Sequence, residues 1–264
     1  MMPYQAAPLY TGQIMKVHRR NLLAGLALGG AFLESEAAEA ADEASAIHDS
    51  LYIPKAHLVE DRKFLHDFMD EFSFVDLITA TPTLRITHIP CFIDRSRGDY
   101  GTIFGHISRN NPQSKTFDGE HAAVIVFRGP HGYISPSWYA KSDLAVPTWN
   151  FGVVHASGKL QPVAEKATLR ALLAKLIDKN EDYRKSTYNF AKLPDSYIGG
   201  MLGGIIGFEM KVELLEGKFK LGHERNETDR ASMVEHLKSE KRERSLYDLT
   251  AEFYKNHPAP PPKA

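Results

Sequence analysis

Four adjacent polar residues, Ser108, Arg109, Asn110 and Asn111, carry the densest chemistry in this sequence. They follow residues 102–106 (TIFGH), a short apolar stretch that is typical of a β-strand. A hydroxyl, a guanidinium and two amides at a strand end can bind an anion, and the planar guanidinium of arginine matches a phosphate with two hydrogen bonds. The same residues also fit a solvated turn in which Arg109 pairs with a surface carboxylate, and spacing alone does not separate the two interpretations.

Arg85 and Thr87 lie on one side of a neighbouring stretch, residues 84–92, whose side chains alternate as in a strand. A phosphate between the end of this strand and the end of the strand before Ser108 is chemically sensible, because it would meet charged and hydroxyl groups from both. We therefore take Arg85, Thr87, Ser108, Arg109 and Asn111 as candidate binding residues.

Both tryptophans, Trp138 and Trp149, lie in residues 127–160, a proline-rich connection between two predicted strands. Trp138, Tyr139 and Trp149 could wall a planar ring. Aromatic residues beside prolines in a long connection more often fill a core or a dimer interface, since tryptophan is usually highly buried. The sequence leaves both roles open.

The sequence has twelve histidines, but none stands in an HExxH motif or in a close cluster with carboxylates. Three of those on strands or strand ends could meet around a metal ion at a barrel mouth; the set is His88, His106, His121, His131 and His155. Hydrogen-bonded strand-end histidines are the more economical interpretation, and we predict no metal site. His88 and His131 are the candidates for proton transfer, because histidine titrates near neutral pH.

Several classes of site are excluded by what the sequence lacks. GxGxxG after a strand, a Walker A motif and GxSxG are all absent, which argues against Rossmann, P-loop and α/β-hydrolase sites. Cys91 is the only cysteine, so an internal disulfide and a cysteine-based zinc site are excluded. Lys+Arg 32 against Asp+Glu 33 gives no overall field that would favour nucleic acid.

The elements that must position these residues follow from the hydrophobic pattern. We predict helices over residues 60–72, 165–179 and 194–204, and a last helix from Asn226 or Thr228 to Lys241. We predict strands over 74–80, 84–92, 102–106, 121–127, 151–160 and 205–214, with a hairpin turn at 215–218 leading into 219–221. Six or so closely spaced strands with helices inserted late predict a mainly β (α+β) fold, an antiparallel barrel with peripheral helices.

Residues 1–40 have the order of an export signal. Basic residues 16–20 (KVHRR) precede the apolar residues 21–33, and Ala38-Glu39-Ala40 matches an A-x-A cleavage site. The apolar stretch is too short to span a bilayer, and Arg19-Arg20 resembles a twin-arginine signal. We expect an exported, periplasmic protein without a stable membrane span after signal removal, or a cytoplasmic protein if the signal is unused. An ordinary amphipathic or disordered leader is the alternative, and translation starts at Met1 or Met15.

Longer motifs resemble a known family. They are YIPK (52–55), THIP (87–90), GHISRNNPQ (105–113), GPHGYISPSWY (129–139), VPTWN (146–150), VHASG (154–158), IGFE (206–209) and GKFKL (217–221). In this order they resemble the PaiB-like proteins, described as FMN-binding negative transcriptional regulators. The resemblance covers residues 51–237.

The resemblance implies an antiparallel split β-barrel of the FMN-binding type, similar to pyridoxamine-phosphate oxidases, and a homodimer with flavin at the subunit interface. In such barrels a serine–arginine pair after a strand holds the flavin phosphate, and Ser108 and Arg109 match that position. Thr87 and His88 would lie along the adjacent strand. The Trp138 and Trp149 segments would approach the ring from the same or the partner subunit.

The chain departs from the family at residues 220–225 (KLGHER), where the family motif resembles KLSQNR, and in its export signal, which does not suit a repressor. We expect an exported FMN-binding split-barrel protein, either a flavin-dependent oxidoreductase on an unidentified small molecule or a flavin carrier, so that enzymatic activity stays open. One alternative is a DNA-binding negative regulator, whose only local basic run is residues 238–244. Another is a haem-binding or haem-degrading barrel with His223 as axial ligand.

The predicted organisation is an export signal in residues 1–40, a linker in 41–50, a split-barrel domain with inserted and C-terminal helices in 51–245, and a tail in 246–264.

Overall fold

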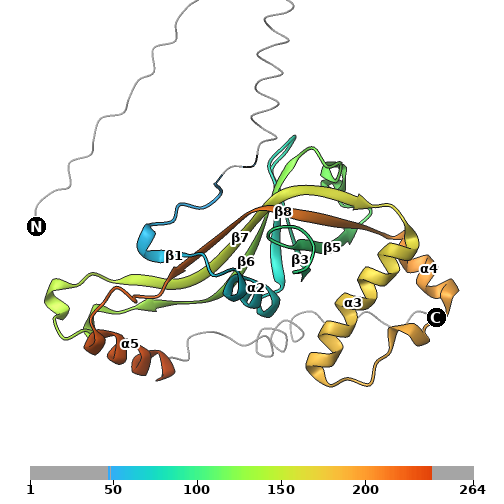
Figure 1. The fold of residues 1–264 in the computed structure, drawn as a ribbon. Coiled ribbons are helices and arrows are strands. Elements are labelled where there is room, and N and C mark those ends of the chain that lie inside the picture. Colours follow the sequence, from blue (N-terminus) through green and yellow to red (C-terminus); the bar gives the residue numbers. More distant parts are fainter. Residues whose placement is uncertain (1–46, 48, 240–264) are drawn as a thin grey trace, which may run out of the picture. The chain divides into compact units, whose positions relative to one another are not determined.

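The computed structural model describes residue 47 and residues 49–239 (Figure 1). The predicted export signal and tail lie outside these residues, as do most of the predicted linker and the last residues of the predicted final helix. Within the described ranges, no helix combines the length and the hydropathy that crossing a membrane requires.

The described chain forms an eight-stranded antiparallel sheet in the order β3-β2-β6-β7-β8-β5-β4, with β1 pairing to β8. The strands are β1 (Leu58–Val59), β2 (Phe74–Thr79), β3 (Arg85–Pro90), β4 (Phe92–Asp94), β5 (Thr102–Ser108), β6 (Ala122–Ile134), β7 (Thr148–Val163) and β8 (Ile205–Lys220). The α-helices are α2 (Arg62–Glu71), α3 (Lys166–Arg184), α4 (Asp195–Gly203) and α5 (Glu227–Ser239). Short 3-10 helices are η1 (Lys55–His57), η2 (Pro112–Thr116), η3 (Pro136–Trp138), η4 (Ser142–Leu144) and η5 (Phe190–Lys192).

The sheet curls because its two ends are consecutive in the chain. β3 and β4 stand at opposite ends of the strand order, yet only Cys91 separates them. In a flat sheet these edges would lie several strand spacings apart, at about 4.8 Å each, which one residue cannot bridge. The sheet therefore bends into a split barrel, and the predicted fold class is confirmed.

Alternation along the strands separates an inner apolar core from an outer face. Leu77 and Ile125 on the inner face are fully buried. The amphipathic helix α2 packs on the same core with Leu65, Phe68 and Met69, as the spacing of residues 60–72 predicts.

One strand is longer than predicted, because the hairpin turn expected at residues 215–218 does not form. β8 continues through it to Lys220. Gly217 looks like a turn residue in the sequence, but it pairs with Val154 and lies against Leu65, whose Cδ2 a Cβ would approach to 2.4 Å. The glycine is therefore required by close packing of α2 on the sheet.

The connection predicted between the strands at 121–127 and 151–160 is also shorter than expected. β6 extends to Ile134 across a register shift between Arg128 and His131, and β7 begins at Thr148. Only residues 135–147 remain as a loop. We call residues 128–153, the extended ends of β6 and β7 with this loop, the arm.

The arm has a small core of its own, separate from the barrel. Ile134 and Tyr139 of the arm bury against Met233 of α5, which packs at the same end of the sheet (Figure 1). At the other end, α3 and α4 enclose a further cluster that includes Leu169, Phe190 and Ile198. The long strands β7 and β8 connect these two ends.

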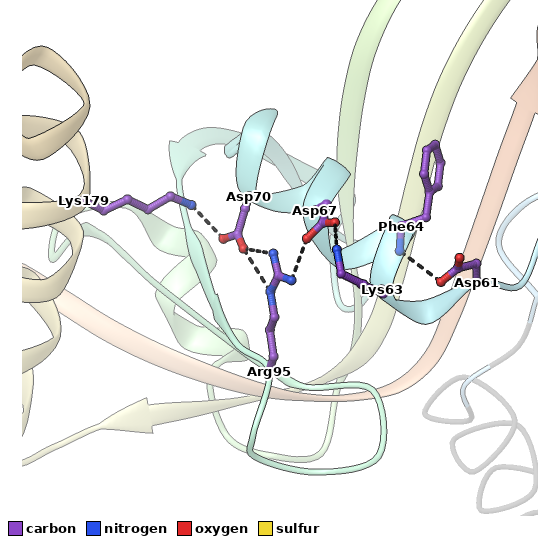
Figure 2. A network of polar contacts seen from close by, with 7 residues as sticks. All are labelled: Asp61, Lys63, Phe64, Asp67, Asp70, Arg95 and Lys179. Atoms are coloured by element: carbon purple, nitrogen blue, oxygen red, sulfur yellow. Dashed lines mark hydrogen bonds and ion pairs between the residues drawn. The ribbon is translucent and has the colours of Figure 1, made fainter.

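An ion-pair network holds α2 to the turn after β4 and to α3 (Figure 2). Arg95 pairs with Asp67 at 2.7 Å and also with Asp70, and Lys179 of α3 reaches Asp70 at 2.8 Å. Figure 2 shows Asp70 between the two cations. All four side chains are partly exposed, so we expect each pair to add little to stability.

Candidate functional site

Several predicted binding residues meet where β3 approaches the end of β5. The Asn111 amide donates to Thr87 Oγ1 at 2.9 Å, and the Thr87 hydroxyl donates to Gln113 Oε1 at 2.5 Å. Gln113 is fully buried, and its Nε2 donates to the carbonyl oxygen of Leu77 at 3.1 Å. These bonds fix the positions of Thr87 and Asn111 against the sheet.

Arg85 lies at the start of β3 with its side chain half-buried. Its guanidinium makes no hydrogen bond or ion pair with any residue in the described part of the chain, although its carbonyl accepts from Gln113 Nε2 at 3.4 Å. A half-buried arginine without an anionic partner is unusual, because desolvating a charge costs free energy unless it is paired. Arg85 is thus free to meet a ligand anion.

One interpretation of the sequence paired Arg109 with a surface carboxylate, but the structure shows no such pair among the described residues. Its Nε donates to the carbonyl of Gly203 at 2.7 Å, one Nη donates to that of Ile205 at 2.8 Å, and its backbone N–H donates to Gly204. The side chain therefore caps the last carbonyls of α4, where a cation is favoured by the helix dipole. Its charge is not neutralised, and it keeps further N–H donors on an exposed side chain.

The candidate anion-binding group consists of Arg85, Thr87, Ser108, Arg109 and Asn111, and the hydrogen bond between Asn111 and Thr87 joins its two segments. It presents two guanidinium charges without a carboxylate partner among the described residues, together with hydroxyl and amide groups. The exposed side chain of Ser108 makes one weak contact in this region, accepting from the Asn110 N–H at 3.3 Å.

His88 is placed on the other side of β3, away from Thr87. Its Nδ1 lies 2.5 Å from Asp76 Oδ1, and Asp76 Oδ2 pairs with Arg128 at 2.7 Å. Asp76 thereby fixes one imidazole nitrogen and leaves Nε2 toward the outer face, where the His88 side chain is 63% exposed. This geometry suits proton exchange on the outer face of the sheet.

The two tryptophans are far from the strand-end group within one chain. Trp149 lies at the start of β7, where it pairs with Tyr133. Ser108 pairs with Ile205 at the start of β8, next to the opposite end of β7, where Val163 pairs with Gly207. The strand from Trp149 to Val163 is roughly 45 Å long. A single copy therefore does not bring Ser108 and Trp149 to the same ligand.

The two indoles also differ in availability. Trp138 is half-buried and stacks on His236 of α5, with ring centroids 5.1 Å apart. Trp149 is 52% exposed and contacts the rings of His131 and Tyr133 on the outer face of the arm. Trp138 has a packing role, and Trp149 is the indole that can reach a partner.

The predicted histidines are dispersed. Among the residues that the structure describes, no three histidine, cysteine or acidic side chains gather as metal ligands. His121 pairs with Asp118 at 2.7 Å, and His223, the suggested haem ligand, contacts the carbonyl of Ala56 through Nε2.

Burial gives two other histidines a defined pH response. Desolvation lowers the pKa of His106, and it lowers the pKa of His155 against an opposing effect of Glu216. The unfolded chain therefore binds protons more readily than the folded one below about pH 6.5. We expect this stability to be fully present above that pH and to be lost as the pH falls below it, through the lowered pKa values of the folded state. Urea unfolding of the wild type and of His106→Leu, above and below pH 6.5, measures the loss. The variant should lose less stability on acidification than the wild type, and an equal loss would contradict the prediction.

Sequence reasoning missed Gln113 and Asp76, which position Thr87 and His88. Gln113 could have been found, because it ends the motif GHISRNNPQ and is a polar residue directly after a proline. Asp76 is a single charge in an apolar strand, FVDLIT, which is a weak but real sign of a partner on the next strand.

Comparison with known proteins identifies relatives of this chain. A family model described as "Putative FMN-binding domain" matches residues 51–214. The Bacillus subtilis (strain 168) protein named "Protease synthase and sporulation protein PAI 2" is 36% identical over 191 residues, 72% of this chain and 90% of the relative. An uncharacterized protein of Aspergillus fumigatus is 26% identical over 234 residues, 70% of this chain and 90% of its own length.

Among solved structures, the flavocytochrome Anf3 from Azotobacter vinelandii matches with a TM-score of 0.49 and 13% identity, covering 70% of this chain and 80% of that one. A likeness this distant transfers no ligand or activity.

Proposed function

The chain belongs to the PaiB-like family of FMN-binding domains, and from that premise we propose that it binds FMN with the phosphate at Arg85, Ser108 and Arg109. The observation that carries this proposal is the charge at the strand end, where both guanidiniums lack a carboxylate partner in the described chain. The hydrogen bond between Asn111 and Thr87 joins the segment after β5 to β3. Bound flavin would supply hydride or electron transfer, while the protein supplies binding, orientation and local charge.

Removing the Arg85 guanidinium is expected to weaken FMN binding by about 10- to 100-fold, since a hydrogen bond to a charged group contributes about 1.5–3 kcal/mol. Riboflavin, which has no phosphate, should bind Arg85→Ala and wild type equally. Flavin fluorescence quenching measures both affinities. Arg97→Ala is the matched control, because Arg97 is already paired with Glu209 at 3.0 Å and should not affect FMN.

Two outcomes would count against this assignment. Purified protein without the visible absorption of an oxidised flavin, and without FMN uptake at micromolar concentration, would remove FMN; a haem Soret band would support the haem alternative instead. The ratio of FMN affinity to riboflavin affinity would count against the phosphate site if it were the same in Arg85→Ala, in Arg109→Ala and in the wild type.

We further propose that the protein acts as a homodimer in which the partner's arm completes the site. This accounts for the distance between Trp149 and Ser108 along one chain and for an exposed indole at the arm. Each of two sites would then combine strand ends from one copy with Trp149 from the other.

Mixing two defective variants tests this arrangement. Arg85→Ala and Trp149→Ala should each bind FMN weakly as pure dimers, because every site lacks one component. A refolded mixture should recover about a quarter of the wild-type tight sites, since half of the dimers are mixed and each has one intact site. Sedimentation as a monomer, or a mixture no better than its components, would contradict the proposal.

The chemistry of the bound flavin is proposed to be oxidoreduction of a small molecule. The leader in residues 16–40 supports export of the folded protein. Replacing Arg19-Arg20 by two lysines should then retain the protein in the cytoplasm, and undiminished export would exclude the twin-arginine route.

A further inference from the structure

One edge of β8 is covered by two different strands with a gap between them. β5 pairs with residues 205–211 of β8, and β1 pairs with Gly217 and Lys218. Between them, Val212 donates its N–H to the Gly101 carbonyl at 3.0 Å. Residues 213–216 have no strand on this edge in the described chain, and Figure 1 shows β1 and β5 at separate places along β8.

A cavity of about 490 Å³ lies at this gap. Its size falls within the range of about 300–1,000 Å³ that is common for small-molecule sites. Aliphatic side chains form part of the walls, beside the polar groups described below. They come from the segment before η1 and from β1, α2 and β8, and they are Leu51, Ile53, Leu58, Val59, Leu65, Leu214 and Leu215. Such walls suit an aliphatic body about as long as a lysine side chain.

Glu216 is the buried polar group of this cavity. The residue is only 7% exposed. Its Oε2 accepts hydrogen bonds from the Ser50 N–H at 3.0 Å and from the Ser50 hydroxyl at 2.8 Å. Oε1 accepts no hydrogen bond from a described residue, so it is open to a donor from a ligand.

The remaining charges of the cavity favour a positive ligand. Among the described residues that line it, Asp49 and Glu60 accompany Glu216, and Arg62 is the one basic side chain. The Arg62 guanidinium lies 5.3 Å from the centre of the Tyr100 ring and pairs with no carboxylate in the described residues. Three carboxylates against one guanidinium give a negative potential that repels phosphates and attracts amines.

We propose that this cavity is a binding site for a small organic cation, a primary ammonium on an aliphatic body, with Glu216 as its anchor. The ammonium donates to Glu216 Oε1, and the aliphatic body lies against the leucines of β8 and α2. The site is separate from the strand-end group, because the length of β5 lies between them. Gly101, beside the cavity, precedes the first residue of β5, and Ser108 is the last residue of β5, so the two are roughly 20 Å apart.

Titration of the full-length protein with n-hexylamine, n-hexanol and n-hexanoate tests the proposal. Binding is followed by saturation-transfer NMR and calorimetry. We expect n-hexylamine to bind with a dissociation constant on the order of millimolar, n-hexanol more weakly, and n-hexanoate not at all. Binding of hexanoate as tightly as hexylamine, or no saturable binding of hexylamine, would overturn the proposal.

Variants identify the anchor. Glu216→Gln keeps the shape and can still accept from Ser50, and it should weaken hexylamine binding at least tenfold. Glu213→Gln, an exposed carboxylate on the same strand, is the matched control and should leave it unchanged. Leu58→Trp at the exposed rim should block the cavity even if Glu216→Gln folds poorly. FMN affinity should be the same in all three variants, so failure of the proposed flavin site and failure of the amine site can be distinguished. Amine binding that is unaltered in both Glu216→Gln and Leu58→Trp would refute the amine site.

Discussion

Replacing Gln113 by leucine is expected to lower the free energy of unfolding by about 3–4 kcal/mol. The Gln113 side chain has no exposure, and its Nε2 lies within hydrogen-bonding distance of Leu77 O, Thr79 Oγ1 and Arg85 O. Its Oε1 accepts from Thr87. Leucine fills the space but leaves these buried groups without a partner, at a cost of about 1–3 kcal/mol each for those that water cannot reach. Urea unfolding followed by circular dichroism measures the loss.

Gln161→Leu is the control for this prediction, because Gln161 is exposed on β7. Its effect should stay within about 0.5 kcal/mol. FMN affinity should also fall in Gln113→Leu, since Thr87 loses the acceptor that fixes its hydroxyl. Equal stability of the two leucine variants would show that the buried network contributes nothing.

Gly158→Ala is expected to cost about 3 kcal/mol, because no side chain fits between β7 and β8 at this position. A Cβ here would lie 2.4 Å from the Lys211 carbonyl oxygen and 2.9 Å from Met210 Cγ. The first contact is with backbone, which cannot swing aside without breaking the pairing of the two longest strands. The residue follows a register shift between Ser157 and Gly158, which draws the strands into this approach.

Gly132→Ala is the matched control, since its Cβ would meet only Leu237 Cδ2 at 3.9 Å, an ordinary contact. Thermal and urea unfolding should place Gly132→Ala within about 0.5 kcal/mol of wild type. A Gly158→Ala protein as stable as Gly132→Ala would mean that β7 and β8 can separate locally at no cost.

Regular apolar spacing made much of this fold predictable. The helical face in residues 60–72 gives α2, and the leucines of residues 165–179 give α3, which is one turn longer than predicted at its C-terminal end. Both ends of β2 are found to within one residue, because Thr81-Pro82 stops it. These elements are set by local pattern, which a sequence displays directly.

Elements set by distant packing were not predictable in the same way. Gly217 signals a turn locally, but its role is to admit Leu65 of α2 against β8. The glycines and proline of residues 129–132 also suggest a loop, yet β6 passes through them with an irregularity between Arg128 and His131. In both places tertiary contacts override the local preference.

The candidate site shows the same division. The sequence identifies Ser108 and Arg109 by their types and their place after a strand, and their role toward FMN stays a prediction. It cannot reveal that Arg109 binds carbonyls at the end of α4, because Gly203 is 94 residues away along the chain. The pairing of His88 with Asp76 likewise depends on the register of β2 and β3, which alternation alone does not fix.

The position of β5 governs the order in which the molecule can fold. β5 precedes β6 and β7 in the chain. In the described chain it pairs with the short β4 and with β8, which is the last strand of the sheet to be synthesised. The strands β2, β3, β6 and β7 pair among themselves over shorter separations and can form early, whereas joining Ser108 to Ile205 closes a long loop and is slow. Arg109 reaches its partners on α4 and β8 only after that closure. The proposed phosphate-binding group would thus be completed at the end of folding, and a ligand held there would select chains in which β8 has already docked.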